Sequence, residues 1–290
     1  MRTLPVLALL ALTGAACAQP LYGVAFTGQF YLINTSTGAA SLIGATGFNR
    51  LNAAAMNIAG EVYVSRTGTG AGDTHKLIKV NPATGVGTLV TDWGTTNDMR
   101  GLAFGEGDVL YGIKEDPVSD QLVKIQLPGG FVTIIGPTGR LDLQGLTAAP
   151  GGALYAVGAP LGQLFSINRN TGAATLIGGA LGDDSQAIEY ASGNTAWAGR
   201  ANLLSVNLLT GASTVIGPMG ISDLRGMAGY RPVPVCYANC DGIGGLTGND
   251  FQCFLNAYVA GSSYANCDGV GGLTGNDFQC FLDKFVAGCS

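Results

Sequence analysis

Short runs of alternating apolar and polar residues, separated by Gly, Asn and Thr, follow one another along most of the chain. In one such unit a small apolar run at 101–104 is followed by an aromatic-centred run at 110–113 and a third run at 123–125. A fourth run follows each turn, as residues 175–178 do. Alternation with a period of two is typical of half-buried β-strands. The pattern therefore predicts an all-β fold for the long N-terminal part of the chain.

The same four-strand unit occurs five times at a spacing of about 40 residues, which is the length of one β-propeller blade. Gly and Asn suit the turns because tight hairpins need positive φ, and small residues suit the first strand because the blades converge on an axis. The turn before the last strand of each unit lies at Thr37 and Gly38, Thr84 and Gly85, Pro128 to Gly130, Thr171 and Gly172, and Thr210 and Gly211.

The two ends of this region complement each other. The first unit begins at Leu21 with its second strand and lacks an inner strand, whereas residues 226–230 are an inner strand with no unit after it. Together they complete one blade, which closes the ring and removes exposed sheet edges. We therefore predict a five-bladed β-propeller with a C-terminal closing strand. A β-sandwich is the alternative architecture.

The first residues have the features of a secretory signal peptide. Arg2 precedes an apolar run at 4–12, and Ala16, Cys17 and Ala18 form a small-residue cleavage site. This run is too short to span a bilayer, and no later segment is long and apolar enough to do so. We predict a signal peptide at 1–18 and a secreted protein, extracellular or on the cell surface. A retained anchor and a lipoprotein attached through Cys17 are the alternatives.

Charge and cysteine content divide the chain into two parts. Only 11% of the residues are charged and the net charge is −5, without a basic cluster, which argues against binding to nucleic acid or an anionic membrane. Apart from Cys17, all cysteines lie between 236 and 289, in a segment too short to fold on its apolar core alone. We therefore predict a disulfide-rich domain at 236–290, which a stiff proline linker at 231–235 joins to the propeller domain at 19–230.

The C-terminal segment has a repeat of its own, with a period of 27 residues. Residues 237–242 return as 264–269, and residues 245–255 return as 272–282. Each copy matches the spacing of an EF-hand-type calcium loop, and an apolar helical stripe follows it. The candidate calcium ligands are Asn239, Asp241, Gly245, Thr247 and Asp250 in the first loop, and Asn266, Asp268, Gly272, Thr274 and Asp277 in the second.

Residues 236–290 resemble the dockerin family, in particular the cysteine-bearing kind at the C-terminus of exported bacterial proteins that ends in Gly-Cys, here Gly288 and Cys289. The resemblance implies two bound Ca²⁺ and docking onto a partner protein, cohesin-like or of another kind. Two departures matter: position 5 is Ile243 or Val270 instead of an oxygen ligand, and position 1 is Asn instead of Asp. We expect weak Ca²⁺ affinity, with a Kd of about 10⁻⁴ to 10⁻³ M. The alternative is a metal-free loop that disulfides hold in shape.

The repeat also assigns the disulfides. Cys240 and Cys253 recur as Cys267 and Cys280, which predicts one bridge within each copy. The two cysteines that do not recur stand at opposite ends of the segment, so we predict a Cys236–Cys289 bridge that joins the termini. Zinc is the alternative for six cysteines, but the spacings are not those of paired zinc knuckles.

Residues suited to catalysis are sparse in the propeller. Glycoside hydrolysis needs two facing carboxylates, whereas the predicted inner strands contain Glu189, with Glu106 just beyond one of them. The single histidine, His75, follows a Gly-rich insertion at 68–72 and is expected to be an exposed loop residue. We therefore predict that the chain is not an enzyme.

A polar residue recurs just before every inner strand, two positions after an aspartate in four of the five units. In a propeller these residues form one ring around a mouth of the central channel, which would hold a glycan or a peptide: Asn52, Arg100, Gln144, Gln186 and Arg225. Alternatively, the aspartates cap turns and their partners join adjacent blades. We favour this second interpretation because the pattern repeats in every unit.

These patterns together predict a secreted, non-catalytic propeller that a calcium-binding, dockerin-like tail tethers to a partner protein or surface assembly. The alternative is an exported carbohydrate-active propeller, glycan-binding or glycoside-hydrolysing, with the same tail.

Overall fold

The computed structural model describes residues 20–158, 161–182, 184–229, 237–240, 246–262, 265–268, 270 and 272–288. The predicted signal peptide and the predicted linker lie outside these residues.

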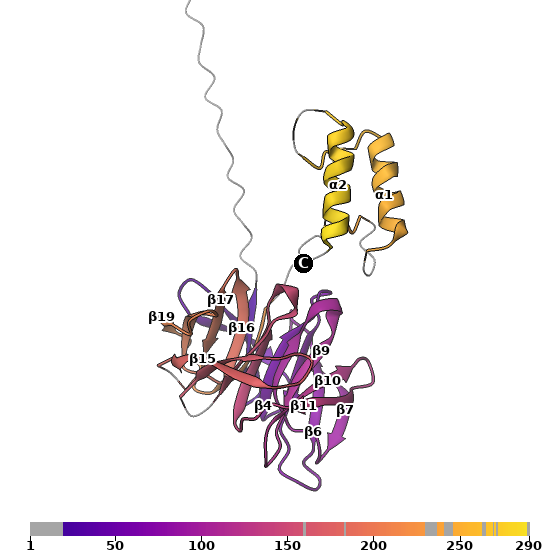
Figure 1. Ribbon diagram of the computed structural model, residues 1–290. Coiled ribbons are helices and arrows are strands. Elements are labelled where there is room, and N and C mark those ends of the chain that lie inside the picture. Colours follow the sequence, from indigo (N-terminus) through magenta and orange to yellow (C-terminus); the bar gives the residue numbers. More distant parts are fainter. Residues whose placement is uncertain are drawn as a thin grey trace, which may run out of the picture.

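The long part of the chain is a five-bladed β-propeller, as predicted (Figure 1). Each blade is a four-stranded antiparallel sheet. From the inner to the outer strand, the blades are β20(Leu224–Gly229), β1(Leu21–Ala25), β2(Gln29–Ile33) and β3(Ala40–Ala45); β4(Leu51–Met56), β5(Val62–Arg66), β6(His75–Val80) and β7(Gly87–Gly94); β8(Met99–Phe104), β9(Leu110–Lys114), β10(Gln121–Gln126) and β11(Phe131–Pro137); β12(Leu143–Ala148), β13(Leu154–Gly158), β14(Gln163–Ile167) and β15(Ala174–Ala180); and β16(Ala187–Ser192), β17(Thr195–Gly199), β18(Asn202–Asn207) and β19(Ser213–Pro218). We number them blades 1 to 5 in this order. Two short 3₁₀ turns, Glu106–Asp108 and Pro150–Gly152, follow β8 and β12.

The predicted closing strand is confirmed. β20 pairs antiparallel with β1, with Leu21 opposite Gly229 and Gly23 opposite Met227. The first blade is thus assembled from both ends of the propeller sequence, and no inner strand is left without a sheet.

Small residues at the third position of the inner strands let neighbouring blades meet. A Cβ added to Gly226 would lie 2.4 Å from the backbone nitrogen of Ala54, and one added to Gly145 would lie 2.8 Å from that of Ile188. The hydrophobic core then fills the space between adjacent sheets: Leu77 of blade 2 and Leu102 and Val123 of blade 3 belong to one buried cluster. Burial of each such side chain contributes roughly 1.5–3 kcal/mol.

The C-terminal segment is helical and contains α1(Gly248–Val259) and α2(Gly275–Ala287). Ala238, Phe254, Ala265 and Phe281 are fully buried there, and the Phe254 and Phe281 rings stack at 4.0 Å. None of the helices in the described residues is long and apolar enough to cross a membrane.

Candidate functional sites

The five residues of the predicted ring do occupy equivalent positions in the blades. Asn52, Arg100, Gln144 and Arg225 are the second residues of inner strands β4, β8, β12 and β20, and Gln186 directly precedes β16. Because these strands surround the axis, the five residues lie at one mouth of the channel. The axis itself is nearly closed: Ala53, Leu146 and Met227 line a cavity of only about 10 Å³. Such a cavity holds one water molecule at most.

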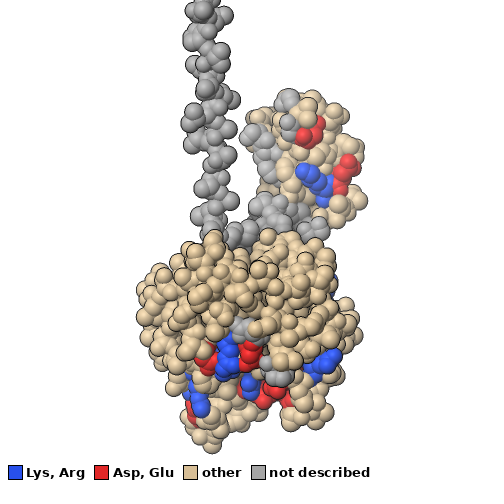
Figure 2. All heavy atoms as spheres, turned by 90° about the vertical axis from the view of Figure 1, so that its left-hand side faces the viewer, with Lys and Arg blue, Asp and Glu red and all other residues tan. Residues whose placement is uncertain are grey.

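The two arginines of the ring are neutralised by carboxylates of their own blades. Arg100 Nε lies 3.0 Å from Glu115 Oε2 and 3.3 Å from Asp98 Oδ2. Arg225 Nε donates to Asp223 Oδ1 at 2.9 Å, and its guanidinium lies 4.9 Å from the centre of the Phe26 ring. Figure 2 shows acidic and basic side chains intermingled in a patch on one face of the propeller, as expected for mutually neutralising pairs.

Aspartates join adjacent blades at this mouth. Thr67 Oγ1 of blade 2 donates to Asp98 Oδ1 at 2.6 Å, directly before blade 3. The Leu143 amide of blade 4 donates to Asp120 Oδ2 of blade 3 at 2.8 Å. In blade 5, Arg200 Nε lies 3.0 Å from Asp223 Oδ1, directly before β20.

The aspartates thus make the bonds between blades that we had expected of the Arg and Gln partners. Sequence reasoning missed Arg200 and Asp120, which lie in connections between the second and third strands, outside the repeated motif.

The three carboxamides of the ring are more than nine-tenths buried. Asn52 is 2% exposed, Gln144 5% and Gln186 7%. Asn52 Nδ2 donates to Thr67 Oγ1 at 3.0 Å, whereas the side-chain oxygens of all three residues have no hydrogen-bond partner among the described residues. Buried amide oxygens are normally paired, so these three positions are exceptions among the described residues.

The position of His75 differs from the prediction. It begins β6 and is only 9% exposed; its Nδ1 accepts the Gly68 amide at 3.0 Å and lies 3.4 Å from Asp98 Oδ1. The expectation of an exposed loop residue was wrong because the Gly-rich insertion folds back against the strand. Gly68 permits this approach, since a Cβ there would lie 2.1 Å from the carbonyl oxygen of Asp73.

Glu189 and Glu106, the two carboxylates considered for catalysis, are not paired with each other in the contacts of the described residues. Glu189 is 2% exposed on β16 and lies 3.5 Å from Thr147 Oγ1. Glu106 binds Arg169 at 2.8 Å on the surface.

The disulfides within the two tail repeats are confirmed. Cys240 bonds to Cys253 with a Cα–Cα distance of 5.7 Å, and Cys267 bonds to Cys280 with a distance of 5.8 Å. Zinc is bound by cysteine thiolates, so these four cysteines are not zinc ligands in the disulfide form. The predicted Cys236–Cys289 bridge lies outside the described residues.

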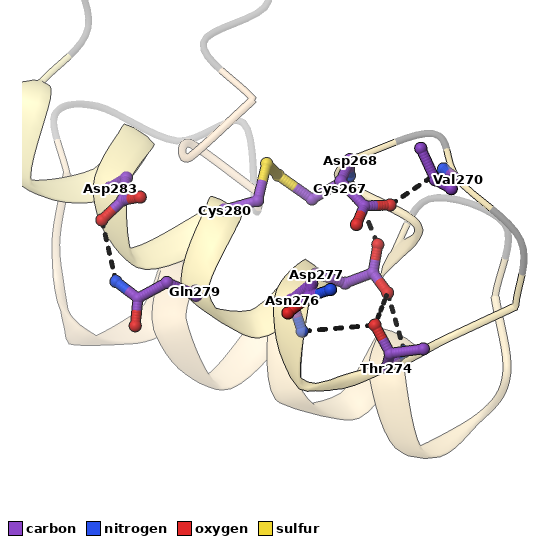
Figure 3. Close-up of a disulfide and its surroundings, with 9 residues drawn as sticks. All are labelled: Cys267, Asp268, Val270, Thr274, Asn276, Asp277, Gln279, Cys280 and Asp283. Atoms are coloured by element: carbon purple, nitrogen blue, oxygen red, sulfur yellow. Dashed lines mark hydrogen bonds between the residues drawn. A yellow bond between two sulfur atoms is a disulfide. The ribbon is translucent and has the colours of Figure 1, made fainter.

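The second predicted calcium loop ends at a buried carboxylate (Figure 3). Asp277, at position 12, is fully buried; its Oδ2 accepts the Thr274 amide at 2.7 Å, and its Oδ1 accepts the Asp268 amide at 3.3 Å. The hydrogen bond from the Thr274 amide is the main cause that lowers the pKa of Asp277, and the bond from the Asp268 amide acts in the same direction. Positions 3, 9 and 12 are thus brought together.

The first loop repeats this geometry where it is described. Asp250 is fully buried and its Oδ2 accepts the Thr247 amide at 2.8 Å. The side-chain oxygens of Asn239 and Asn266, both at position 1, are buried too. Asp241 and Gly245 lie outside the described residues.

Val270, at position 5 of the second loop, is 70% exposed, while its amide donates to Asp268 Oδ1 at 2.9 Å. Gly272 lies in a bend of the same loop. Among the described residues no three His, Cys, Asp or Glu side chains gather as a metal site, so further oxygen ligands would come from Asn, Thr and the backbone.

Comparison with known proteins supports the propeller fold. No protein-family model matches the sequence, and no curated protein matches it. A chain from the crystal structure of a nidogen/laminin complex is 13% identical, with a TM-score of 0.50 over 74% of this chain and 99% of that chain. At this low sequence identity, the structural similarity shows a shared fold and nothing about function.

Two further solved structures are similar at a lower TM-score. TolB from Acinetobacter baumannii is 10% identical, with a TM-score of 0.48 over 71% of this chain and 54% of its own. The PQQ-bound aldose sugar dehydrogenase from Streptomyces coelicolor is 14% identical, with a TM-score of 0.48 over 74% and 83%.

Proposed function

We propose that this chain is a secreted, non-catalytic β-propeller that its helical tail tethers to a partner protein or surface assembly in a calcium-dependent manner. The observation that carries the proposal is the duplicated loop of the tail, where a buried aspartate at the start of each helix accepts hydrogen bonds from the loop before it. Oxygen ligands at these spacings suit Ca²⁺, which takes carboxylate, amide and backbone oxygens.

Export and the lack of catalysis have separate support. Two disulfides favour an oxidising compartment, since such bonds persist outside the reducing cytosol. Glu189 is the one carboxylate within the five inner strands, whereas acid–base hydrolysis of a glycan needs two.

Calcium titration of the full chain by calorimetry tests the proposal. We expect millimolar-range Ca²⁺ to release heat in the oxidised protein, and Asp277→Ala to remove about half of that heat because it removes one of two loop carboxylates at position 12. Asp283→Ala is the matched control, since Asp283 is an exposed residue of α2 that bonds only to Gln279 in the described contacts. No heat in the wild-type protein would overturn the calcium part of the proposal.

Capture experiments test tethering itself. The immobilised full chain should retain a partner from the secreted proteins of the same cells in Ca²⁺ and release it in EDTA. Retention by the Asp250→Ala, Asp277→Ala double variant equal to that of the wild type would contradict docking through the calcium loops.

A further inference from the structure

A groove of about 550 Å³ opens between blades 1 and 2, and none of the five ring residues lines it. Three connections form it: the β1–β2 turn, the β3–β4 connection and the β5–β6 loop. Because strands alternate in direction, these connections all lie on the face where the inner strands begin. The lining of the groove is mostly polar. It comprises Thr27, Gln29, Asn49, Arg66, Asp73, Thr74 and Lys76, with glycines, Ala45 and Phe48.

One wall of the groove is a loop in which blade 2 differs from the other blades. The β5–β6 loop, residues 67–74, is the longest of the five connections between second and third strands; the next is residues 115–120 in blade 3, and those of blades 1 and 5 are residues 26–28 and 200–201. In repeat proteins, insertions in single repeats map to loops on one face, often the binding face. The ring at the channel mouth lacks this distinction, since every blade contributes to it.

The long loop is held in one conformation by its own contacts. Asp73 accepts hydrogen bonds from Arg66, from Arg50 at 2.7 Å and from Thr69 Oγ1 at 2.8 Å. Arg66 Nη1 also donates to the Thr74 carbonyl at 2.6 Å. A wall that is already ordered costs little conformational entropy when a ligand binds.

The groove presents mixed donors and acceptors without a strong net charge. Arg66 pairs with Asp73, and Lys76 pairs with Asp92. Charge neutralisation of this kind disfavours phosphate-rich ligands, whereas amides, hydroxyls and paired charges bind ligand hydroxyl groups, which both donate and accept. Half-buried Phe48 adds an aromatic surface against which the C–H face of a sugar ring packs.

We propose that this groove binds an uncharged oligosaccharide. Its volume lies within the roughly 300–1,000 Å³ of typical ligand sites. The site binds and does not hydrolyse, because Asp73, the one acid of the lining, is occupied by Arg66 and Thr69, whose hydrogen bonds hold its pKa well below its usual range. This proposal is independent of docking through the tail.

The test is an array of neutral, uronate-bearing and phosphorylated oligosaccharides probed with the full chain, followed by calorimetry with the strongest neutral binder. We expect Asn49→Ala and Lys76→Ala each to weaken binding at least tenfold without lowering the Tm of the propeller. Lys79→Ala is the matched control: it lies on the same strand and pairs with Glu61, outside the groove, and should leave the affinity unchanged.

Three outcomes would overturn the proposal: no neutral oligosaccharide bound, stronger binding to the acidic members of the array, or neutral-sugar binding that neither Asn49→Ala nor Lys76→Ala weakens. An experiment in EDTA distinguishes failure of the sugar-binding proposal from failure of calcium-dependent docking through the tail. Because the groove contains no residue of the calcium loops, sugar binding should persist in EDTA, and its loss there would place the sugar site in the tail instead.

Discussion

Backbone contacts between blades determine which residues the inner strands accept. At Gly226 an added Cβ would lie 2.4 Å from the Ala54 nitrogen and 2.6 Å from the Ala53 carbonyl carbon, the two atoms that form the peptide bond between these residues. Backbone atoms cannot rotate away as a side chain does, so even one methyl group must separate two blades. The small inner-strand residues are therefore a packing requirement of ring closure.

Gly226→Ala should destabilise the propeller by about 1–3 kcal/mol, the usual cost of overpacking a core. Gly179→Ala in β15 is the matched control, because an added Cβ there meets no atom within 4 Å and the residue's φ is not positive. Denaturant unfolding of both variants measures the difference. Equal stability of the two would mean that blades 1 and 2 do not meet at Gly226 as described.

Asp120 adds a pH dependence to the propeller. Burial raises its pKa to about 6, from an ordinary value of 3.8, although the Leu143 amide bonds to it. Between these two values the folded state holds a proton that the unfolded chain has lost, so stability falls as pH rises through that interval. Asp120→Asn should flatten this slope. Melting temperatures between pH 4 and pH 7 measure it, and an unchanged slope in the variant would contradict the assignment.

At the scale of elements, the six-residue strand β20 closes the ring of blades. It supplies the inner strand of blade 1 and contributes Leu224 and Met227 to a core cluster that also contains Leu21 and Leu203. It therefore links blade 1 to blade 5 and removes the sheet edge that β1 would otherwise expose.

Truncation after Gly220 should cost the propeller several kcal/mol and cause self-association, because it removes β20 and opens the edge of β1. Truncation after Gly229 is the control, since it removes the tail but keeps the strand. Calorimetry and light scattering of the two truncated proteins make the comparison. If both melted at the same temperature, closure by β20 would contribute nothing to stability.

At the scale of the whole molecule, the sequence predicted what repetition encodes. Period-two runs and recurring turns led to the propeller and its closing strand, and the 27-residue period led to Cys240–Cys253 and Cys267–Cys280. It did not predict contacts that occur in single blades. His75 is buried because the insertion before it folds back on its strand, and Arg200 joins two blades through Asp223; neither contact repeats along the chain, so no periodic pattern records it.

The propeller and the tail should also melt independently, because different forces stabilise them. The described propeller residues contain no cysteine and rely on buried apolar area, whereas each tail repeat is closed by a bridge worth roughly 3 kcal/mol. Reduction should therefore lower one calorimetric transition of the full chain and leave the other unchanged. If Ca²⁺ binds only the folded tail, it should raise that same transition, by about 2.7 kcal/mol at a hundredfold excess over the Kd. The ionised Asp277 also stabilises the tail, because hydrogen bonds lower its pKa in the folded state. This contribution is fully present at a pH above the ordinary aspartate pKa and is lost as the pH falls through the folded pKa. A single transition that responds to both reductant and Ca²⁺ would show instead that tail and propeller unfold as one unit.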